Sequence, residues 1–287
     1  MRGYAVQSFR DAGMLLARAE DALLEREAEN NLPLGLLGNA ARGEMAVGPE
    51  ALFLCFDDGA PRGVALRAGS DRIVLSRAEP DALDAVVAWL RGHGVMLSGV
   101  CAENETARGF ADRWSTVTHL RSSVSVRQRL YQATAVTAPT SPASGVPRLA
   151  RPEEDDWVAE GIVAFEREAT EVVRAPAVAL AIARARIERG QIWVWEDGGR
   201  PVSMAARSRR TRTGECVNLV WTPPSRRKNG YATSLVAALT ARILDDGAAF
   251  ACLYTDLANP TSNAIYQRIG YVPVVDARVI AFVTSAY

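Results

Sequence analysis

Residues 222–235 read TPPSRRKNGYATSL and join an apolar segment, CVNLVW, to a longer amphipathic one, GYATSLVAALTARIL. The first segment predicts a β-strand. The second predicts a helix, because Leu235, Val236, Leu239 and Ile243 recur at helical spacing. The stretch between them combines two prolines, three consecutive cations and a Gly-Tyr-Ala step. It is therefore a strand-to-helix connection of unusual composition.

Two interpretations of this connection are open: an anion-binding loop, or a basic turn on a solvated surface. The first backbone N–H groups of a helix have no partner within it, and the helix dipole adds positive charge there, so a phosphate is held by main chain. Gly230 would let the backbone approach such a ligand closely. The cations at 226–228 would attract it, and the prolines would stop the preceding strand from pairing. The backbone groups left free would suit an extended ligand.

The connection is neither a Walker P-loop nor a Rossmann fingerprint, because neither glycine pattern occurs. The pattern Arg227-x-x-Gly230-x-Ala232 instead resembles the pyrophosphate loop of the GNAT acetyltransferase superfamily. The second signature of that superfamily is matched one strand further on, in NPTSNAIYQRIGY, by Asn259, Ser262, Tyr266, Gly270 and Tyr271. The resemblance covers residues 149–283. Lys228 departs from it, since members often have glycine there.

Two halves of the chain repeat one order of elements. LFLCFDDGAPRGVALRAGSDRIVLS and QIWVWEDGGRPVSMAARSRRTRTGECVNLVW each contain an alternating strand, an Asp-Gly hairpin turn and further strands. An amphipathic helix, a strand and a second helix follow in both halves. A proline-rich linker separates them. We expect a mixed α/β (α+β) fold with two GNAT-like domains, each a mixed, mostly antiparallel central sheet flanked by helices. The expected boundaries are 1–136 for the first domain, 137–148 for the linker and 149–287 for the catalytic domain.

The first half lacks both signatures. Only RAEP stands before its helix, without the Gly-x-Ala step and with an acid where cations are needed. Aligning Asn104 with Asn259 places Ala111 opposite Tyr266, so the tyrosine is missing. We interpret this half as a degenerate copy that supports the structure, shapes the substrate cleft or mediates dimerisation.

Composition excludes several classes of function. The formal net charge of the 287 residues is zero, so no field of the whole chain attracts nucleic acid or a membrane surface. The four cysteines are far apart in the sequence, which predicts reduced thiols in a cytoplasmic protein. No apolar run approaches the roughly 18 residues of a membrane span. The two histidines do not combine with the cysteines into a metal-binding pattern, so we expect no metal.

The resemblance implies acetyl-CoA as co-substrate and transfer of its acetyl group to an amine. It implies that the main chain of Val220–Thr222 pairs with the pantetheine arm and that a backbone N–H there stabilises the developing oxyanion. Tyr266 matches the general acid. The cofactor-binding residues implied are Val220, Trp221, Thr222, Arg227, Lys228, Asn229, Gly230, Tyr231, Ala232, Thr233, Asn259, Ser262 and Tyr266.

The general base is not identified by the resemblance. The carboxylates near the expected site are Glu215, Asp256, Glu166 and Glu168, and we favour Glu215, which begins the strand leading to the loop. The function expected is an acetyl-CoA-dependent N-acetyltransferase acting on a small-molecule or peptide amine, as a monomer or homodimer. The alternatives are an acyltransferase with another acyl group and a CoA-binding regulatory or scaffold protein without catalysis.

Overall fold

The structure is a computed structural model that describes residues 3–169 and 174–284. The chain divides into two compact units. The first comprises residues 1–130 with 274–287, and the second comprises residues 131–273.

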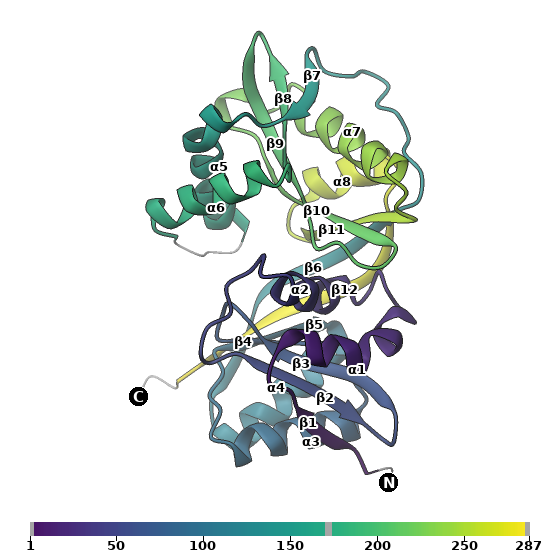
Figure 1. Cartoon of the computed structure of the whole chain (residues 1–287), viewed down its shortest axis with the longest axis vertical. Helices are drawn as coiled ribbons and strands as arrows, with labels where there is room; N and C mark the ends of the chain where they lie inside the picture. Colours follow the sequence, from purple (N-terminus) through teal and green to yellow (C-terminus); the bar gives the residue numbers. More distant parts are fainter. Residues whose placement is uncertain (1–2, 170–173, 285–287) are drawn as a thin grey trace. The chain divides into compact units, whose positions relative to one another are not determined.

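The first unit begins with a strand and two helices, which are followed by hairpin strands, a helix, a strand and a helix (Figure 1). Its elements are β1 (Ala5–Ser8), α1 (Ala12–Leu24), α2 (Asn31–Ala41), β2 (Leu52–Asp57), β3 (Pro61–Arg67), β4 (Arg72–Leu75), α3 (Pro80–Gly92), β5 (Gly99–Glu103), α4 (Asn104–Thr118), most of β6 (Arg121–Ala133) and most of β12 (Val272–Val283). The strand order is β1-β2-β3-β4-β5-β12-β6, and the only parallel pair with a described register in this unit is β4–β5.

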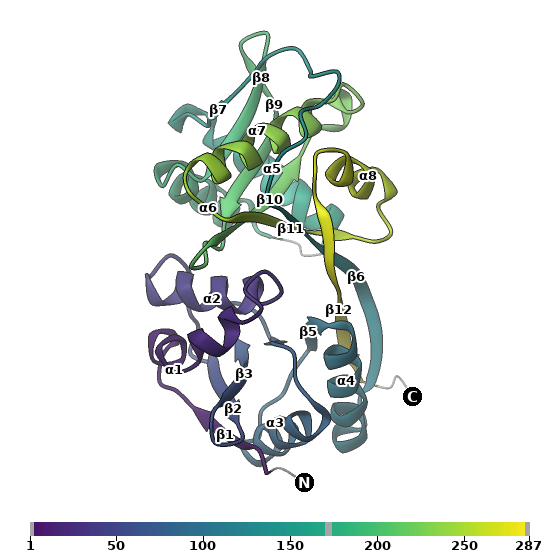
Figure 2. The same cartoon turned by 90° about the vertical axis from the view of Figure 1, so that its right-hand side faces the viewer.

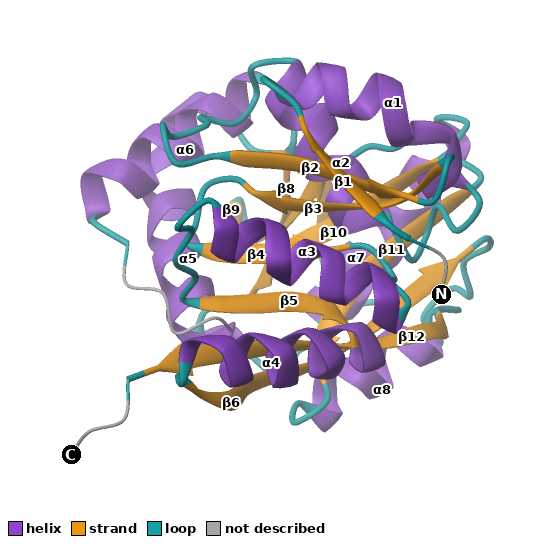
Figure 3. Ribbon diagram, turned by 90° about the horizontal axis from the view of Figure 1, so that it is seen from below, coloured by secondary structure: helices purple, strands orange, loops and turns teal. Residues whose placement is uncertain are grey.

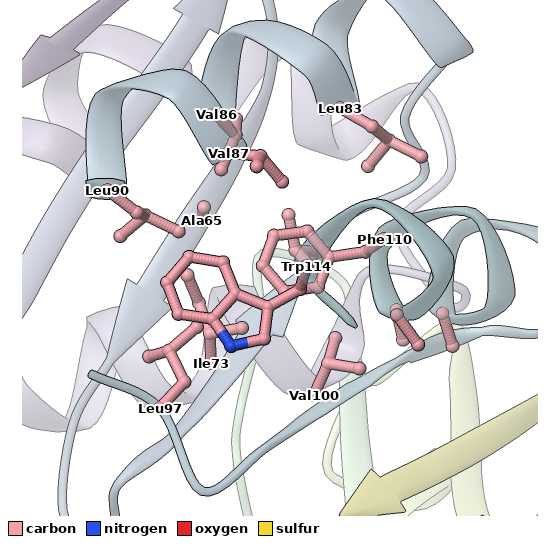
Figure 4. Packing of buried hydrophobic residues seen from close by; sticks show 14 of the residues in the cluster. Ala65, Ile73, Leu83, Val86, Val87, Leu90, Leu97, Val100, Phe110 and Trp114 are labelled. Atoms are coloured by element: carbon pink, nitrogen blue, oxygen red, sulfur yellow. The ribbon is translucent and has the colours of Figure 1, made fainter. Parts of the chain in front are cut away.

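Helices cover both faces of this sheet because its strands bury side chains on both sides. Phe53, Cys55, Val64 and Leu66 pack against α1 and α2. The alternate residues of the same strands pack against α3 and α4, which Figure 3 shows side by side over one face. The indole of Trp114 lies at the centre of this second layer, among side chains of α3 and of the strands (Figure 4). Trp114, which is fully buried, therefore fills the space between the two helices and the sheet.

The second unit repeats this order with a longer strand-to-helix connection. Its elements are β7 (Val146–Leu149), the 3₁₀ turn η1 (Pro152–Glu154), α5 (Asp155–Ala169), α6 (Pro176–Glu188), β8 (Ile192–Asp197), β9 (Arg200–Ser208), β10 (Gly214–Trp221), the 3₁₀ turn η2 (Pro224–Arg226), α7 (Tyr231–Asp245), β11 (Phe250–Asp256) and α8 (Pro260–Arg268). The strand order is β11-β10-β9-β8-β7, with β10–β11 parallel and the other pairs antiparallel.

The second sheet also lies between two helical layers. Val158, Ala179 and Ala183 of α5 and α6 pack on one face, and α7 and α8 pack on the other (Figure 1). Figure 2 shows α7 lying across the strands of this unit. The predicted fold class, a mixed and mostly antiparallel sheet flanked by helices and present twice, is confirmed.

The last strand of the chain does not complete the sheet of its own half. Residues 277–281 of β12 pair antiparallel with residues 99–103 of β5 in the first unit. The final residues of β6, from Tyr131 on, belong to the second unit. The compact units thus differ from the predicted ranges 1–136 and 149–287 at the C-terminus. The physical reason is that strand pairing, and not position in the sequence, decides which sheet a strand joins.

Candidate functional site

The connection between β10 and α7 leaves a helix N-terminus open. Gly230 is the N-cap residue of α7, with φ 77° and ψ 0°, a left-handed conformation that favours glycine. It offers no side chain to cap the first N–H groups. A Cβ atom at Gly230 would meet only the Cβ of Ala143, at 3.8 Å, so no other atom lies within contact of this position. This is the arrangement that binds phosphate through main-chain N–H groups.

The loop in front of this helix is held by its own side chains. Arg227 donates from Nε to the carbonyl of Thr222 at 3.0 Å, and its Nη2 donates to both carboxylate oxygens of Glu168 at 2.9 Å. Asn229 donates from Nδ2 to the carbonyl oxygens of Arg226 and Arg227. Arg227 thus ties the loop to α5, and the start of α7 stays available to a ligand.

Lys228 also adopts a left-handed conformation, with φ 67°. This is the position where the superfamily often has glycine, and the backbone geometry explains that preference. A residue with a Cβ atom in this region costs about 1–2 kcal/mol relative to the right-handed conformation.

The neighbouring strands β10 and β11 separate next to the loop. Their parallel pairing has three register pairs, Gly214–Phe250, Glu215–Ala251 and Cys216–Cys252. Both strands continue beyond the last pair, β10 to Trp221 and β11 to Asp256. On its other side, β10 still pairs with β9 as far as Trp221. Below, "the strand gap" means the interval between residues 217–221 of β10 and residues 253–256 of β11, and "its apex" means the pair Cys216–Cys252.

β10 has a bulge within the strand gap. The register with β9 shifts between Asn218 and Trp221, and Leu219 has φ 49°. The Oδ1 atom of Asn218 and the Nε1 atom of Trp221 are buried, and neither has a hydrogen-bond partner among the described residues. Sequence reasoning missed Asn218. The available signal was one amide side chain within the apolar run CVNLVW.

Tyr266, on α8, lies in the core cluster between the sheet and α7. Its side chain is 7% exposed and belongs to the core cluster that contains Val217 and Leu253, the first residues beyond the apex on each strand. Its ring meets that of Tyr271 edge-on, with 6.0 Å between centroids. Burial raises the pKa of Tyr266 to about 12, against a hydrogen bond with Ser262 that lowers it. The phenol therefore remains protonated at neutral pH and can only donate to an anion.

Asn259 and Ser262 have a local structural role. The Oδ1 atom of Asn259 accepts from the backbone N–H of Ser262 at 3.0 Å and so caps α8. Sequence reasoning missed Asn263, whose Nδ2 donates to the carbonyl oxygens of Asp256 and Asn259. Its Oδ1 accepts a hydrogen bond from the hydroxyl of Tyr131 at 3.0 Å. Asn263 therefore fixes α8 to the end of β11.

The other predicted site residues on β10 and α7 are partly or fully buried, and several of their side chains make contacts within the protein. Tyr231 donates to Asp197 at 2.6 Å in the β8–β9 turn, so its side chain anchors the helix start to that turn. Trp221 is buried against Trp157, and the hydroxyl of Thr222 lies 2.9 Å from that of Ser203. The partly buried candidates at the end of β10 and in the first turn of α7 are Val220, Ala232 and Thr233.

The carboxylate favoured as general base does not face the strand gap. Glu215 precedes the apex, but both its oxygens accept hydrogen bonds from the guanidinium of Arg207, at 3.0 and 2.6 Å. Arg207 also bonds Asp246, the C-cap residue of α7, at the helix end opposite to Gly230. These contacts do not support Glu215 as the base. Its position at a strand start was predicted correctly, but its ion-pair partner was invisible in the sequence.

Two of the alternative carboxylates are likewise bound to arginines. Glu166 accepts from Arg174 with both oxygens, and Glu168 accepts from Arg227. Asp256 differs, because its Oδ1 accepts from the backbone N–H of Ala258 at 2.8 Å and not from an arginine. No group of three or more His, Cys, Asp or Glu residues that could hold a metal was found within 3–169 and 174–284. Among the helices formed by these residues, none is long and apolar enough to cross a membrane.

The first unit has no comparable loop in its described residues. The N-cap residue of α3 is Glu79, followed by Pro80 at the first helical position, so a carboxylate stands where the second unit has Gly230. Trp114 occupies the space between α3 and α4 (Figure 4). The interpretation of the first half as a degenerate copy stays a prediction.

Comparisons with known proteins identify a family for part of the chain. Residues 147–274 match the family model described as an acetyltransferase (GNAT) domain. A comparison with curated protein sequences returned no match.

Solved structures share the fold over the whole chain. A Drosophila protein aligns with TM-score 0.68 at 13% identity, covering 99% of this chain and 100% of its own. A GCN5-related N-acetyltransferase from Sphaerobacter thermophilus gives 0.60 at 15% identity, covering 99% and 97%. A tandem GNAT protein from the clavulanic acid biosynthesis pathway gives 0.59 at 13% identity, covering 99% and 100%. The open helix N-terminus, the strand gap and these matches lead to one conclusion: residues 147–274 are a domain of the GNAT acetyltransferase superfamily, in a chain with the fold of tandem GNAT proteins.

Proposed function

We propose that the second unit binds acetyl-CoA and transfers its acetyl group to a primary amine of a small molecule or peptide. The observation that carries this proposal is the separation of β10 and β11 beyond Cys216–Cys252, next to a helix N-terminus capped by a left-handed glycine. The family supports an acyltransferase, and the proposal adds the acyl group and the acceptor class.

The loop and the start of α7 would hold the diphosphate of the co-substrate. The helix dipole favours an anion at the start of α7, where a Cβ atom at Gly230 would meet only the Cβ of Ala143. The exposed side chains of Arg226 and Lys228 add positive charge at the rim. Arg227 serves differently, because its guanidinium is already bound to Glu168 and Thr222.

The strand gap fits the pantetheine arm. An extended chain with amide groups can pair with the edge of β10 that β11 leaves free after Cys216. The buried Oδ1 atom of Asn218 lacks a donor among the described residues, and an amide N–H of the arm would supply one. A buried polar atom without a partner costs about 1–3 kcal/mol, so occupancy of the gap would relieve this penalty.

Acetyl-CoA supplies the activated acetyl group when bound. Tyr266 would act on the sulfur side of the reaction, because it belongs to the core cluster that contains Val217 and Leu253, the residues that follow the apex. With a pKa of about 12, the phenol holds its proton more firmly than a thiol of ordinary pKa, about 8.5. Tyr266 therefore donates a hydrogen bond to the departing thiolate, and complete proton transfer is unfavourable.

The amine must lose a proton before or during transfer. Glu166, Glu168 and Glu215 each accept hydrogen bonds from an arginine through both oxygens, which leaves them poorly placed as proton acceptors. Asp256 is the carboxylate whose role as base should be tested, with transfer through water as the other route.

The test measures CoA binding by calorimetry and thiol release from acetyl-CoA with a broad panel of amines. We expect binding of CoA by the wild-type chain and amine-dependent thiol release that falls in Tyr266→Phe. Binding without acetylation of any amine would favour the regulatory or scaffold alternative. Release with other acyl-CoA thioesters only would reassign the acyl group. Absence of CoA binding would refute the proposal.

A further inference from the structure

Ser203 is a polar residue in the buried middle of β9. The strand reads VSMAA over residues 202–206, and the other residues of this run are apolar and buried. The side chain of Ser203 is itself 0% exposed. A hydroxyl group in such surroundings costs free energy unless it makes hydrogen bonds, so its partners indicate what the residue does.

The hydroxyl of Ser203 bonds to the end of β10. It donates to the carbonyl of Trp221 at 3.2 Å, and its oxygen lies 2.9 Å from the hydroxyl oxygen of Thr222. A serine hydroxyl has one proton, and here that proton is directed to the carbonyl, so the threonine hydroxyl donates to Ser203 Oγ. Ser203 therefore contacts both residues that form the peptide group between positions 221 and 222.

This peptide group lies where β10 leaves the sheet. Trp221–Met204 is the last register pair between β10 and β9, and it follows the bulge that begins at Asn218. The next carbonyl, that of Thr222, accepts a hydrogen bond from Nε of Arg227 at 3.0 Å. Side chains thus bond to the carbonyl on each side of the Thr222 Cα atom, at the point where the ladder with β9 ends.

The bond from Ser203 also fixes the direction of the N–H group of Thr222. A trans peptide is planar, so its carbonyl and its N–H point in opposite directions. The carbonyl of Trp221 points toward β9, which carries Ser203, and β10 lies between β9 and β11 in the sheet. The N–H of Thr222 therefore points away from β9, to the side of the strand gap. No carbonyl in the part of the chain that the structure describes accepts a hydrogen bond from it.

We propose that Ser203 is a positioning residue, which holds the peptide group between Trp221 and Thr222 so that the N–H of Thr222 donates to an amide carbonyl of the pantetheine arm. The inference rests on the proposed function, which places the arm in the strand gap. Ser203 itself touches no ligand and acts through the backbone of β10. A donor that is oriented before the ligand arrives does not have to be ordered on binding, so the hydroxyl of Ser203 raises the affinity for the arm.

The first experiment separates the arm from the rest of CoA. Calorimetric titration of the full chain compares CoA with 3′-phospho-ADP, which has the nucleotide and the diphosphate of CoA but lacks the arm. Ser203→Ala should bind CoA about fivefold or more weakly than the wild type, because the donor is no longer oriented, and should bind 3′-phospho-ADP within about twofold of the wild type. A purely structural role of Ser203 would weaken both ligands alike.

Ser208→Ala is the matched control on the same strand. Ser208 is also buried, at 8% exposed, and its Oγ donates to the carbonyl of Cys216 at 3.4 Å, before the strand gap begins. Both substitutions remove a buried hydroxyl that bonds to a carbonyl of β10. Ser208→Ala should leave the ratio of the two affinities unchanged, so the comparison isolates the position of Ser203 beside the gap.

Hydrogen exchange of the Thr222 amide tests the same bond in the wild type. CoA should slow the exchange of this amide by about tenfold or more, whereas 3′-phospho-ADP should not. Thr222→Val removes the other end of the contact with Ser203 with little change of shape, and it should also weaken CoA binding without weakening that of 3′-phospho-ADP. The test therefore does not depend on the folding of Ser203→Ala.

The outcomes separate this inference from the proposed function. Absence of CoA binding by the wild type would refute the proposed function and the role of Ser203 with it. If the wild type binds CoA, three results would overturn the role of Ser203 alone: equal affinities of Ser203→Ala and the wild type for CoA, equal weakening of both ligands, or no effect of CoA on the exchange of the Thr222 amide.

Discussion

Replacing Gly230 separates the backbone role of the loop from its electrostatic role. Gly230→Ala and Gly230→Glu impose the same left-handed strain at φ 77°, and each should destabilise the chain by about 1–2 kcal/mol. Neither side chain meets a steric barrier at its Cβ atom, because only Ala143 lies within contact distance, at 3.8 Å. The two variants should therefore unfold at similar denaturant concentrations.

Affinity for CoA should differ between the two variants. A carboxylate about 4 Å from one phosphate charge repels it by about 1 kcal/mol in water and about 4 kcal/mol at an effective dielectric constant of 20. Gly230→Glu should thus bind CoA about 5-fold to 900-fold more weakly than Gly230→Ala. The assay is calorimetric titration of CoA at low ionic strength, with urea unfolding of each variant as the measure of folding.

The comparison with alanine makes the result decisive. Equal affinities of the Glu and Ala variants for CoA would refute the placement of the diphosphate at α7. A Glu variant that is much less stable than the Ala variant would refute the inference that no atom other than the Cβ of Ala143 lies within contact of this position.

Substitutions at Lys228, Tyr266 and Glu215 test the contacts around the site. Lys228→Gly should stabilise the chain by roughly 0.5–1 kcal/mol in urea unfolding, because the relief of strain at φ 67° exceeds the entropic cost of glycine. The control Arg226→Gly should destabilise the chain. The opposite order of stabilities would contradict the strain argument. Tyr266→Phe should lower kcat by about 10-fold to 100-fold with unchanged CoA affinity. In the wild type, the rate should not fall through ionisation of Tyr266 until the pH approaches its pKa of about 12. A loss of activity near pH 10 that is absent from Tyr266→Phe would contradict the buried, protonated phenol. Glu215→Gln should lower the free energy of unfolding by about 1–3 kcal/mol, because the ion pair with Arg207 is lost, but it should leave kcat within about twofold. A large fall in kcat in a folded variant would restore Glu215 as the general base.

The fold could be predicted well from the sequence because its signals are local. The Asp-Gly turns, the helical spacing of Leu235, Val236 and Leu239, and the repeated element order depend on neighbouring residues only. The close approach of backbone expected at Gly230 is of the same kind, since it follows from the absence of a Cβ atom.

The pairing of β12 with β5 in the first unit could not be predicted in this way. The choice of β5 as the partner of residues 277–281 depends on pairing between segments that are distant in the sequence. The ranges predicted for the two domains follow the order of the sequence, whereas the compact units place residues 274–287 with the first unit.

The sequence by itself determined which residues form the loop, which helix follows it and which half of the chain carries both signatures, because these properties reside in short stretches. Tertiary structure alone decided the partners of the charged side chains. Glu215 is bound to Arg207, Glu168 to Arg227, and Arg186 is left with a buried nitrogen that has no partner in the described part of the chain. The physical reason is that an ion pair depends on distances of about 3–4 Å between elements that the chain brings together only on folding.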